Sequence, residues 1–137
     1  MIGCTILHCW PASAQCEEDK FIDSCAVLLD DYKYIRTYNA VEIEGSTNYP
    51  YSNAYIFSKG VEYVIITCDQ GDNDKKTVIN LYNRSRKPVA SNYDKNTNKH
   101  YEKIIFKCSA TGVFFIQTLL GLKENNCGIS MLGFKGK

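Results

Sequence analysis

"AYIFSKGVEYVIITC" (residues 54–68) is the stretch that decides the fold. It contains two runs rich in aromatic and β-branched residues, 54–58 and 61–68, and the pair Lys59-Gly60 between them is typical of a turn. Similar runs separated by polar turns predict further strands at 32–43, 77–83, 88–93, 101–108, 113–120 and 127–134. About eight short strands without intervening helices predict an all-β fold, an antiparallel β-sandwich or jelly roll.

A single helix is expected before the strands. In "CEEDKFIDSCAVLLDDY" (16–32), Phe21, Cys25 and Leu28 recur at helical spacing, which predicts one short amphipathic helix. Acidic residues 17–19 fall in its first turn, where negative charge is favourable beside the positive end of the helix dipole.

Composition bounds the class of protein. The chain has 137 residues, the size of one domain with its own core. Its net charge is +1, from 16 Lys and Arg against 15 Asp and Glu, so no long-range field draws polyanions toward it. This balance argues against nucleic acid as a partner, and the lack of an apolar run of about 18 residues argues against a membrane span.

The N-terminus indicates export. "MIGCTILHCWPASAQ" (1–15) has no charged residue and contains Ala12-Ser13-Ala14, a sequence of the kind that signal peptidases cleave. We interpret residues 1–14 as an atypical or truncated signal peptide, with a short apolar strand as the alternative, and expect 15–137 to form a single β-sandwich domain. Seven cysteines without zinc-binding spacing favour an oxidising compartment, so the predicted location is secreted, periplasmic or at the cell surface.

Three segments together resemble the pre-peptidase C-terminal domains of bacteria and related secreted jelly rolls: "YIFSKGVEYVIITC" (55–68), "INLYNRSRKPVAS" (79–91) and "IIFKCSATGVFFIQT" (104–118). The chain also looks like small secreted bacterial proteins of unknown function. Asn83 stands where this family commonly has Asp, and Arg86-Lys87 replace its glycine turn. The resemblance covers residues 54–120 and implies a jelly-roll fold, export and a non-catalytic role.

Strand directions predict which cysteines can meet. If successive strands alternate, Cys68 ends the third strand at the edge where Cys127 starts the last one, and Cys25 lies at the edge where Cys108 ends the sixth strand. These positions predict the disulfides Cys68–Cys127 and Cys25–Cys108, with Cys16 left over or replacing Cys25. The alternative is that several of these cysteines are buried free thiols.

No catalytic apparatus is apparent, and we expect no enzyme. Behind the predicted cleavage point the only histidine is His100, in a polar turn, and nothing places a pair of carboxylates on facing strands. In the loop 69–74, Asp69, Asp72 and Asp74 supply the oxygen ligands that Ca²⁺ prefers and are candidates for a weak calcium site. The loop lacks the spacing of an EF-hand, so a plain polar loop is the favoured alternative, and no other cofactor is expected.

Tyrosines offer a candidate binding surface. Tyr32, Tyr34 and Tyr38 share period-two parity in the first strand, so they are expected on one face, where aromatic rings can stack on sugars or contact a partner protein. The alternative is that they fill the core.

These patterns favour a non-catalytic secreted binding module whose ligand is a glycan or a cell-surface protein. The alternative is a disulfide-stabilised structural or accessory protein of the bacterial envelope or secretion machinery. Three cations, Arg84, Arg86 and Lys87, crowd the tip of the hairpin 79–93. We interpret this tip as a solvated turn that protects against edge-to-edge pairing, not as a phosphate site.

Overall fold

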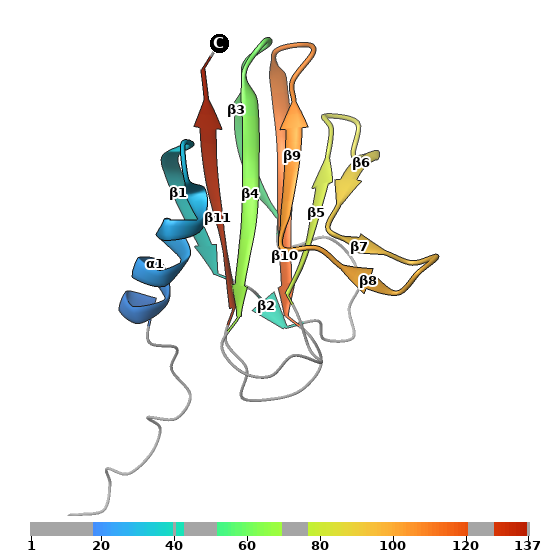
Figure 1. Cartoon of the computed structure of the whole chain (residues 1–137). Helices are drawn as coiled ribbons and strands as arrows, with labels where there is room; N and C mark the ends of the chain where they lie inside the picture. Colours follow the sequence, from blue (N-terminus) through green and yellow to red (C-terminus); the bar gives the residue numbers. More distant parts are fainter. Residues whose placement is uncertain (1–17, 40, 43–51, 70–76, 121–127, 137) are drawn as a thin grey trace, which may run out of the picture.

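The computed structural model of the chain describes residues 18–39, 41–42, 52–69, 77–120 and 128–136, and all structural statements refer to these. They form two packed β-sheets with one short helix beside them (Figure 1). The predicted all-β sandwich with a single short helix is confirmed. Residues 1–17, which include the predicted signal peptide, lie outside the described part of the chain.

The first sheet contains four antiparallel strands in the order β1-β11-β4-β9. Their bounds are Lys33–Asn39 for β1, Gly128–Lys135 for β11, Glu62–Asp69 for β4 and Lys103–Lys107 for β9. Both of the long central strands, β4 and β11, are thus paired on two sides, and β1 and β9 form the edges.

The second sheet is built around β10 and has the order β2-β10-β5-β6, with β3 also paired to β10. The bounds are Val41–Glu42 for β2, Asn53–Phe57 for β3, Val78–Tyr82 for β5, Pro88–Ser91 for β6 and Gly112–Leu120 for β10. All pairs are antiparallel except the short parallel pair of β2 with β10. β3 and β2 therefore share one side of β10, and β5 occupies the other.

A third, two-stranded element projects from the sandwich (Figure 1). It pairs β7 (Tyr93–Asp94) with β8 (Lys99–His100), where the sequence predicts only a turn. The ring of Tyr93 lies 4.6 Å from that of His100, its cross-strand neighbour, and this aromatic pair supports the added ladder.

Strand β4 is buried on both faces, which explains its unbroken apolar run. Side chains alternate along a strand, so Tyr63 and Ile65 point between the sheets, whereas Val64 and Ile66 point to the outer face. All four are buried. Full burial of each aliphatic side chain contributes about 1.5–3 kcal/mol, so covering both faces of this one strand is a large part of the driving force for folding.

The core between the sheets is organised by aromatic rings. Phe57, which is fully buried, stacks at 4.1 Å on Tyr63 and at 4.9 Å on Phe114, joining β3, β4 and β10. Contacts of this kind contribute about 0.5–1.5 kcal/mol beyond the burial of their area.

The turn at Lys59-Gly60 carries the chain from one sheet to the other and does not close a hairpin. β3 belongs to the second sheet and β4 to the first, and Gly60 adopts the positive φ of 85° that glycine tolerates. A second corner, between β9 and β10, makes the reverse crossing. The two corners bond to each other, because Gly60 N–H donates to the carbonyl of Cys108 at 2.9 Å and Cys108 N–H donates to that of Val61 at 3.1 Å.

Helix α1 (Glu18–Ala26) and the following 3-10 turn η3 (Val27–Leu29) cover the outer face of the first sheet. Cys25 and Leu29 pack there with Val64, Ile66 and Met131. The predicted short helix is confirmed, and its apolar side covers the outer face of β4 and β11. Leu28, which was predicted on the same apolar stripe, lies in η3 and is exposed.

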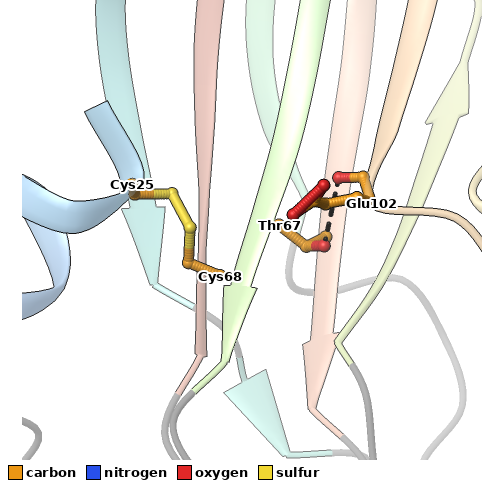
Figure 2. The surroundings of a disulfide bond; sticks show 4 residues. All are labelled: Cys25, Thr67, Cys68 and Glu102. Carbon is orange, nitrogen blue, oxygen red and sulfur yellow. Dashed lines mark hydrogen bonds between the residues drawn. A yellow bond between two sulfur atoms is a disulfide. The ribbon is translucent and has the colours of Figure 1, made fainter. Parts of the chain in front are cut away.

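The disulfide pairing differs from the prediction. Cys25 is bonded to Cys68 across 43 positions of sequence (Figure 2). Cys108 is a buried free thiol. The predicted pairs Cys68–Cys127 and Cys25–Cys108 are therefore wrong, although both Cys25 and Cys68 are bridged. Cys16 and Cys127 lie outside the described residues.

The parity of β4 explains this correction. Cys68 shares the outward parity of Val64 and Ile66, so its sulfur faces α1, whereas Thr67 points the opposite way in Figure 2 and donates to the carbonyl of Glu102. Cys108 belongs to the core between the sheets, on the other side of the first sheet. The prediction considered only which edge each cysteine occupies and not which face.

Asn92 joins the projecting hairpin to both β5 and the start of β9. Its side-chain oxygen accepts from Ile79 N–H at 2.8 Å, and its amide nitrogen donates to the carbonyls of Thr77 at 3.1 Å and Tyr101 at 3.0 Å. The residue is fully enclosed. Each of these bonds gives a backbone group at this junction a side-chain partner.

Replacement of Asn92 is expected to destabilise the fold strongly. Asn92→Ala leaves three backbone partners without their bond, and with about 1–3 kcal/mol for each unsatisfied buried group we expect a loss of roughly 3 kcal/mol in urea unfolding. Asn96→Ala, in the exposed turn of the same hairpin, serves as the control and should cost less than about 0.5 kcal/mol. Equal losses for the two variants would contradict the role of Asn92.

The disulfide gives a second prediction. A non-reduced tryptic digest should contain peptide 21–33 linked to peptide 60–75, and Cys108 should react with an alkylating reagent only after unfolding. Cys25→Ala should lower the free energy of unfolding by about 4 kcal/mol, the chain-entropy value for a loop of this length. Wild-type protein unfolded in the presence of a reductant should fall to the same value. A Cys25 peptide recovered on Cys108 would overturn the pairing.

Candidate binding face on the second sheet

The three tyrosines predicted to share a face do not do so. Tyr32 packs under the helix on the outer side of the first sheet, Tyr34 is 53% exposed, and Tyr38 is only 8% exposed within the core between the sheets. A β-bulge between Tyr34 and Arg36 inserts Ile35 into β1 and reverses the parity beyond it. The prediction of one tyrosine face is therefore wrong, since period two was counted through the bulge.

Only some of the other predicted site residues lie in the described part of the chain. Asp69 ends β4, whereas Asp72 and Asp74 lie outside the described residues. Within the described ranges, no three His, Cys, Asp or Glu side chains gather as metal ligands, and no helix is long and apolar enough to cross a membrane. His100 pairs with Tyr93 in the projecting hairpin.

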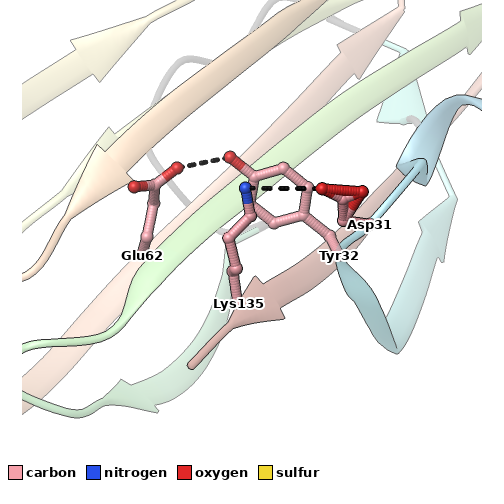
Figure 3. A network of polar contacts seen from close by, with 4 residues as sticks. All are labelled: Asp31, Tyr32, Glu62 and Lys135. Carbon is pink, nitrogen blue, oxygen red and sulfur yellow. Dashed lines mark hydrogen bonds and ion pairs between the residues drawn. The ribbon is translucent and has the colours of Figure 1, made fainter. Parts of the chain in front are cut away.

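Tyr32 is the centre of a polar cluster on the first sheet (Figure 3). Its hydroxyl donates to the carboxylate of Glu62, and the ammonium of Lys135 lies 4.6 Å from the centre of its ring and 3.8 Å from Oδ2 of Asp31. Burial, followed by the hydrogen bond and the negative charge of Glu62, raises the pKa of Tyr32 to about 12. The phenol therefore stays protonated, and the cluster anchors the start of β1 to β4 and β11.

The outer face of the second sheet is chemically different from the rest of the sandwich. In the second sheet, strands β3, β5, β6 and β10 contain no Asp, Glu, Lys or Arg, and the charged residue is Glu42 of the short strand β2; every strand of the first sheet carries at least one charged residue. Helix α1 packs on the first sheet, so no helix among the described elements covers this face. We call the outer side of these four strands the uncharged face; its outward residues include Ala54, Ile56, Val78, Asn80, Tyr82, Ser91, Val113, Phe115, Gln117 and Leu119.

Gln117 organises the polar centre of the uncharged face. Its side-chain oxygen accepts from Nδ2 of Asn80 and from the hydroxyl of Tyr82, both at 3.1 Å. Asn80 is the cross-strand partner of Gln117, and Tyr82 is that of Phe115. Two bonds at one carbonyl fix the orientation of the amide, which is only 8% exposed, and direct its N–H groups away from these partners.

An apolar area adjoins this centre at the β3 edge. Ala54, Tyr55, Ile56 and Val113 line a shallow open hollow, and Ile56 is 61% exposed. Amide groups, a tyrosine and an apolar hollow thus lie on one continuous sheet surface without a formal charge.

The β5–β6 turn forms the rim of the uncharged face. The side chain of Asn83 accepts from the N–H groups of Ser85 at 2.9 Å and Lys87 at 3.0 Å, and its carbonyl accepts from that of Arg86 at 2.8 Å. Arg84, Arg86 and Lys87 are exposed, as expected for a solvated turn. However, the guanidinium of Arg86 lies over the ring of Phe115 at 3.9 Å, so this side chain folds back onto the sheet.

The sequence contained a signal for this face. The absence of charge from residues 52–58, 77–83 and 113–120 can be read directly, but tyrosine spacing was followed instead. The architecture and the site together define a β-sandwich in which strands β3, β5, β6 and β10 of the second sheet carry no charged residue and no described helix covers their outer face. A scan of family models, a search of curated proteins and a search of solved structures found no match to this chain. The resemblance to pre-peptidase C-terminal domains stays a prediction.

The Tyr32 cluster is expected to make the free energy of unfolding fall as the pH becomes alkaline. Its pKa of about 12 in the folded state lies above the ordinary value of 10.0, so the folded protein keeps a proton that the unfolded chain has lost between these values. The stabilisation is complete below pH 10.0 and is lost as the pH rises toward 12. In urea unfolding from about pH 8 to about pH 11, Tyr32→Phe should lose stability less steeply than wild type. Tyr38, whose pKa burial also raises, is present in both proteins and cancels. Parallel curves would contradict the assignment.

Proposed function

We propose that this chain is a non-catalytic binding module that holds a glycan on the uncharged face of its second sheet. The observation that carries the proposal is the absence of charge from β3, β5, β6 and β10, combined with the pre-oriented amides of Gln117 and Asn80. Sugar hydroxyls are neutral donors and acceptors, and side-chain amides can both donate to them and accept from them.

Aromatic side chains on the same face support a sugar ligand. Tyr82 and Phe115 are cross-strand neighbours and half-buried, so their rings are held in place before a ligand arrives. The apolar C–H side of a pyranose packs well on such rings, and little side-chain entropy is lost when rigid groups form the contact. Tyr34, on the first sheet, has no such amide neighbours among the described residues; its hydroxyl bonds to Thr37.

Export to an oxidising compartment is part of this proposal. The bond between Cys25 and Cys68 supports it, because disulfides persist mainly in secreted, periplasmic and cell-surface proteins. In such a compartment, a non-catalytic module would bind cell-surface or extracellular polysaccharide for the cell that exports it.

A glycan array tests the proposal with two matched tyrosines. We expect wild-type protein to bind at least one glycan class, Tyr82→Ala to weaken that binding about tenfold, or 1.4 kcal/mol, and Tyr34→Ala to leave it unchanged. Tyr82 is half-buried and Tyr34 is exposed, so the melting temperatures of both variants are measured beside the array to show that each is folded. Loss of binding in Tyr34→Ala alone would indicate that the binding site lies on the first sheet and not on the second. Absence of binding to every glycan would reject the proposal.

A structural or accessory role is the second candidate, and the exposed Ile56 beside its apolar hollow favours it. Such a surface fits the apolar contact of a protein partner better than a sugar. Ile56→Glu places a charge in the hollow without touching the core. A protein captured from an envelope fraction by wild type, released by Ile56→Glu and retained by Tyr82→Ala would favour this role over the glycan.

A further inference from the structure

We infer that two copies of this chain associate through the outer face of the first sheet, with an acidic line on the helix of each copy against a basic line on β9 of the other. This inference goes beyond the proposed function, because it concerns the first sheet and not the uncharged face. It starts from two sets of exposed residues that have the same pattern and opposite charge.

The basic line runs along β9, an edge strand of the first sheet, and consists of Lys103, Ile105 and Lys107. These residues alternate with Ile104 and Phe106, which pack into the core between the sheets, so the line points to the outer face. All three members are exposed, and Ile105 is 55% exposed. Lysines on an edge strand protect it from pairing with other strands, but an exposed isoleucine between them does not serve that purpose.

The acidic line lies on the same side of the sandwich and consists of Asp23, Val27 and Asp30. Helix α1 and η3 pack on the outer face of the first sheet through Cys25 and Leu29, whereas the members of the line are exposed to solvent. Asp23 lies one helical turn before Val27, which is 74% exposed. The helix thus presents an apolar side chain between two acids, and β9 presents one between two bases.

The two lines are similar in length. Asp23 and Asp30 are seven positions apart, which is about 11 Å at the rise of a helix. Lys103 and Lys107 are four positions apart, which is about 13 Å along a strand. An acidic line laid along a basic line therefore brings an acid near a base at both ends.

The charges of the two lines are not used within the described part of the chain. None of their four charged groups forms an ion pair with another described residue. Glu62 is the cross-strand neighbour of Lys107, but its carboxylate accepts a hydrogen bond from the hydroxyl of Tyr32. The neighbouring acid Asp31, by contrast, is paired with Lys135 and is left out of the line.

Twofold symmetry satisfies both lines at once. In an isologous dimer, if α1 of one copy meets β9 of the other, then β9 of the first copy also meets α1 of the second. Each of the two contacts joins an acidic line to a basic line and places Val27 against Ile105. Because α1 packs mainly on β4 and β11, the helix of one copy can lie over β9 of the other.

The apolar centres and the charges have different effects on this contact. Burial of Val27 and Ile105 supplies attraction that does not depend on salt. Exposed ion pairs add little affinity, but they favour this pairing of surfaces and are weakened by salt. Two small contacts place the dimer at the weak end of protein interfaces, so we expect a Kd of roughly 10–100 µM.

Such a dimer has a consequence for the arrangement of the two sandwiches. The contact uses the first sheet of each copy, so the second sheets lie on opposite outer sides. Under the proposed function, one dimer would present two uncharged faces and would connect two glycan chains.

Reversal of the charges in matched pairs tests the contact. Lys103→Glu with Lys107→Glu gives a chain with two acidic lines, and Asp23→Lys with Asp30→Lys gives a chain with two basic lines. Neither double variant should form a homodimer. An equimolar mixture of the two should form a heterodimer with the affinity of wild type, because each contact again joins acids to bases.

The control carries the same change in net charge at a distance from this face. Lys59→Glu with Lys87→Glu alters two exposed turn lysines and should leave dimerisation unchanged. Sedimentation equilibrium up to about 500 µM protein measures the Kd of each sample. We expect the Kd of wild type to rise at least tenfold when NaCl is raised from about 50 mM to about 500 mM, and each reversed variant to weaken it at least tenfold.

Melting temperatures show whether each variant is folded. If the helix variant does not fold, the variant of β9 and the dependence on salt decide the question alone. Wild type that stays monomeric at about 500 µM would overturn the inference. A dimer that survives Lys103→Glu with Lys107→Glu, that the control also abolishes, or that non-reducing electrophoresis shows to be disulfide-linked would overturn it as well. None of these outcomes bears on the proposed function, which the glycan array tests separately.

Discussion

The burial of β4 on both faces is the constraint on which the rest of the structure depends. A strand presents two sets of side chains, and here both are large and apolar: Tyr63 and Ile65 on one side, Val64 and Ile66 on the other. An antiparallel sheet usually leaves one face to water. Because this strand cannot, the second sheet covers its inner face, and α1 with η3 covers its outer face.

This arrangement makes the two outer surfaces of the sandwich different. The first sheet uses its outer surface to hold the helix, and its charged residues surround that contact, as in the cluster of Tyr32, Glu62 and Lys135. Among the described elements, no helix covers the outer surface of the second sheet. Packing of the core requires only that Ile79, Leu81 and similar inward residues be apolar, so it does not dictate the absence of charge from the outward positions. The proposed contact with a neutral ligand would account for that absence.

The sequence predicts the elements better than their relations. Runs of β-branched and aromatic residues identified the strands of the two sheets except β2, which was predicted as the end of a single strand over 32–43. The spacing of Phe21 and Cys25 identified the helix, because both signals are local and periodic. Which sheet a strand joins is decided by contacts between residues distant in sequence. The sequence therefore did not predict that the chain passes from the second sheet to the first at Gly60. The tyrosine face failed for a related reason: a single inserted residue, Ile35, reverses every later assignment of face. The uncharged strands, by contrast, were readable from composition alone.

The disulfide has a consequence for how the chain reaches its native pairing. Cys68 faces Cys25 only because β4 lies in the register that pairs Ile129 with Cys68 and Met131 with Ile66. A slip of β4 by one residue would turn Cys68 toward the interior and place Thr67 under the helix. The disulfide can therefore form only when β4 is correctly aligned with β11. A chain in which Cys25 and Cys68 are oxidised is thus one whose central strand has reached its native register.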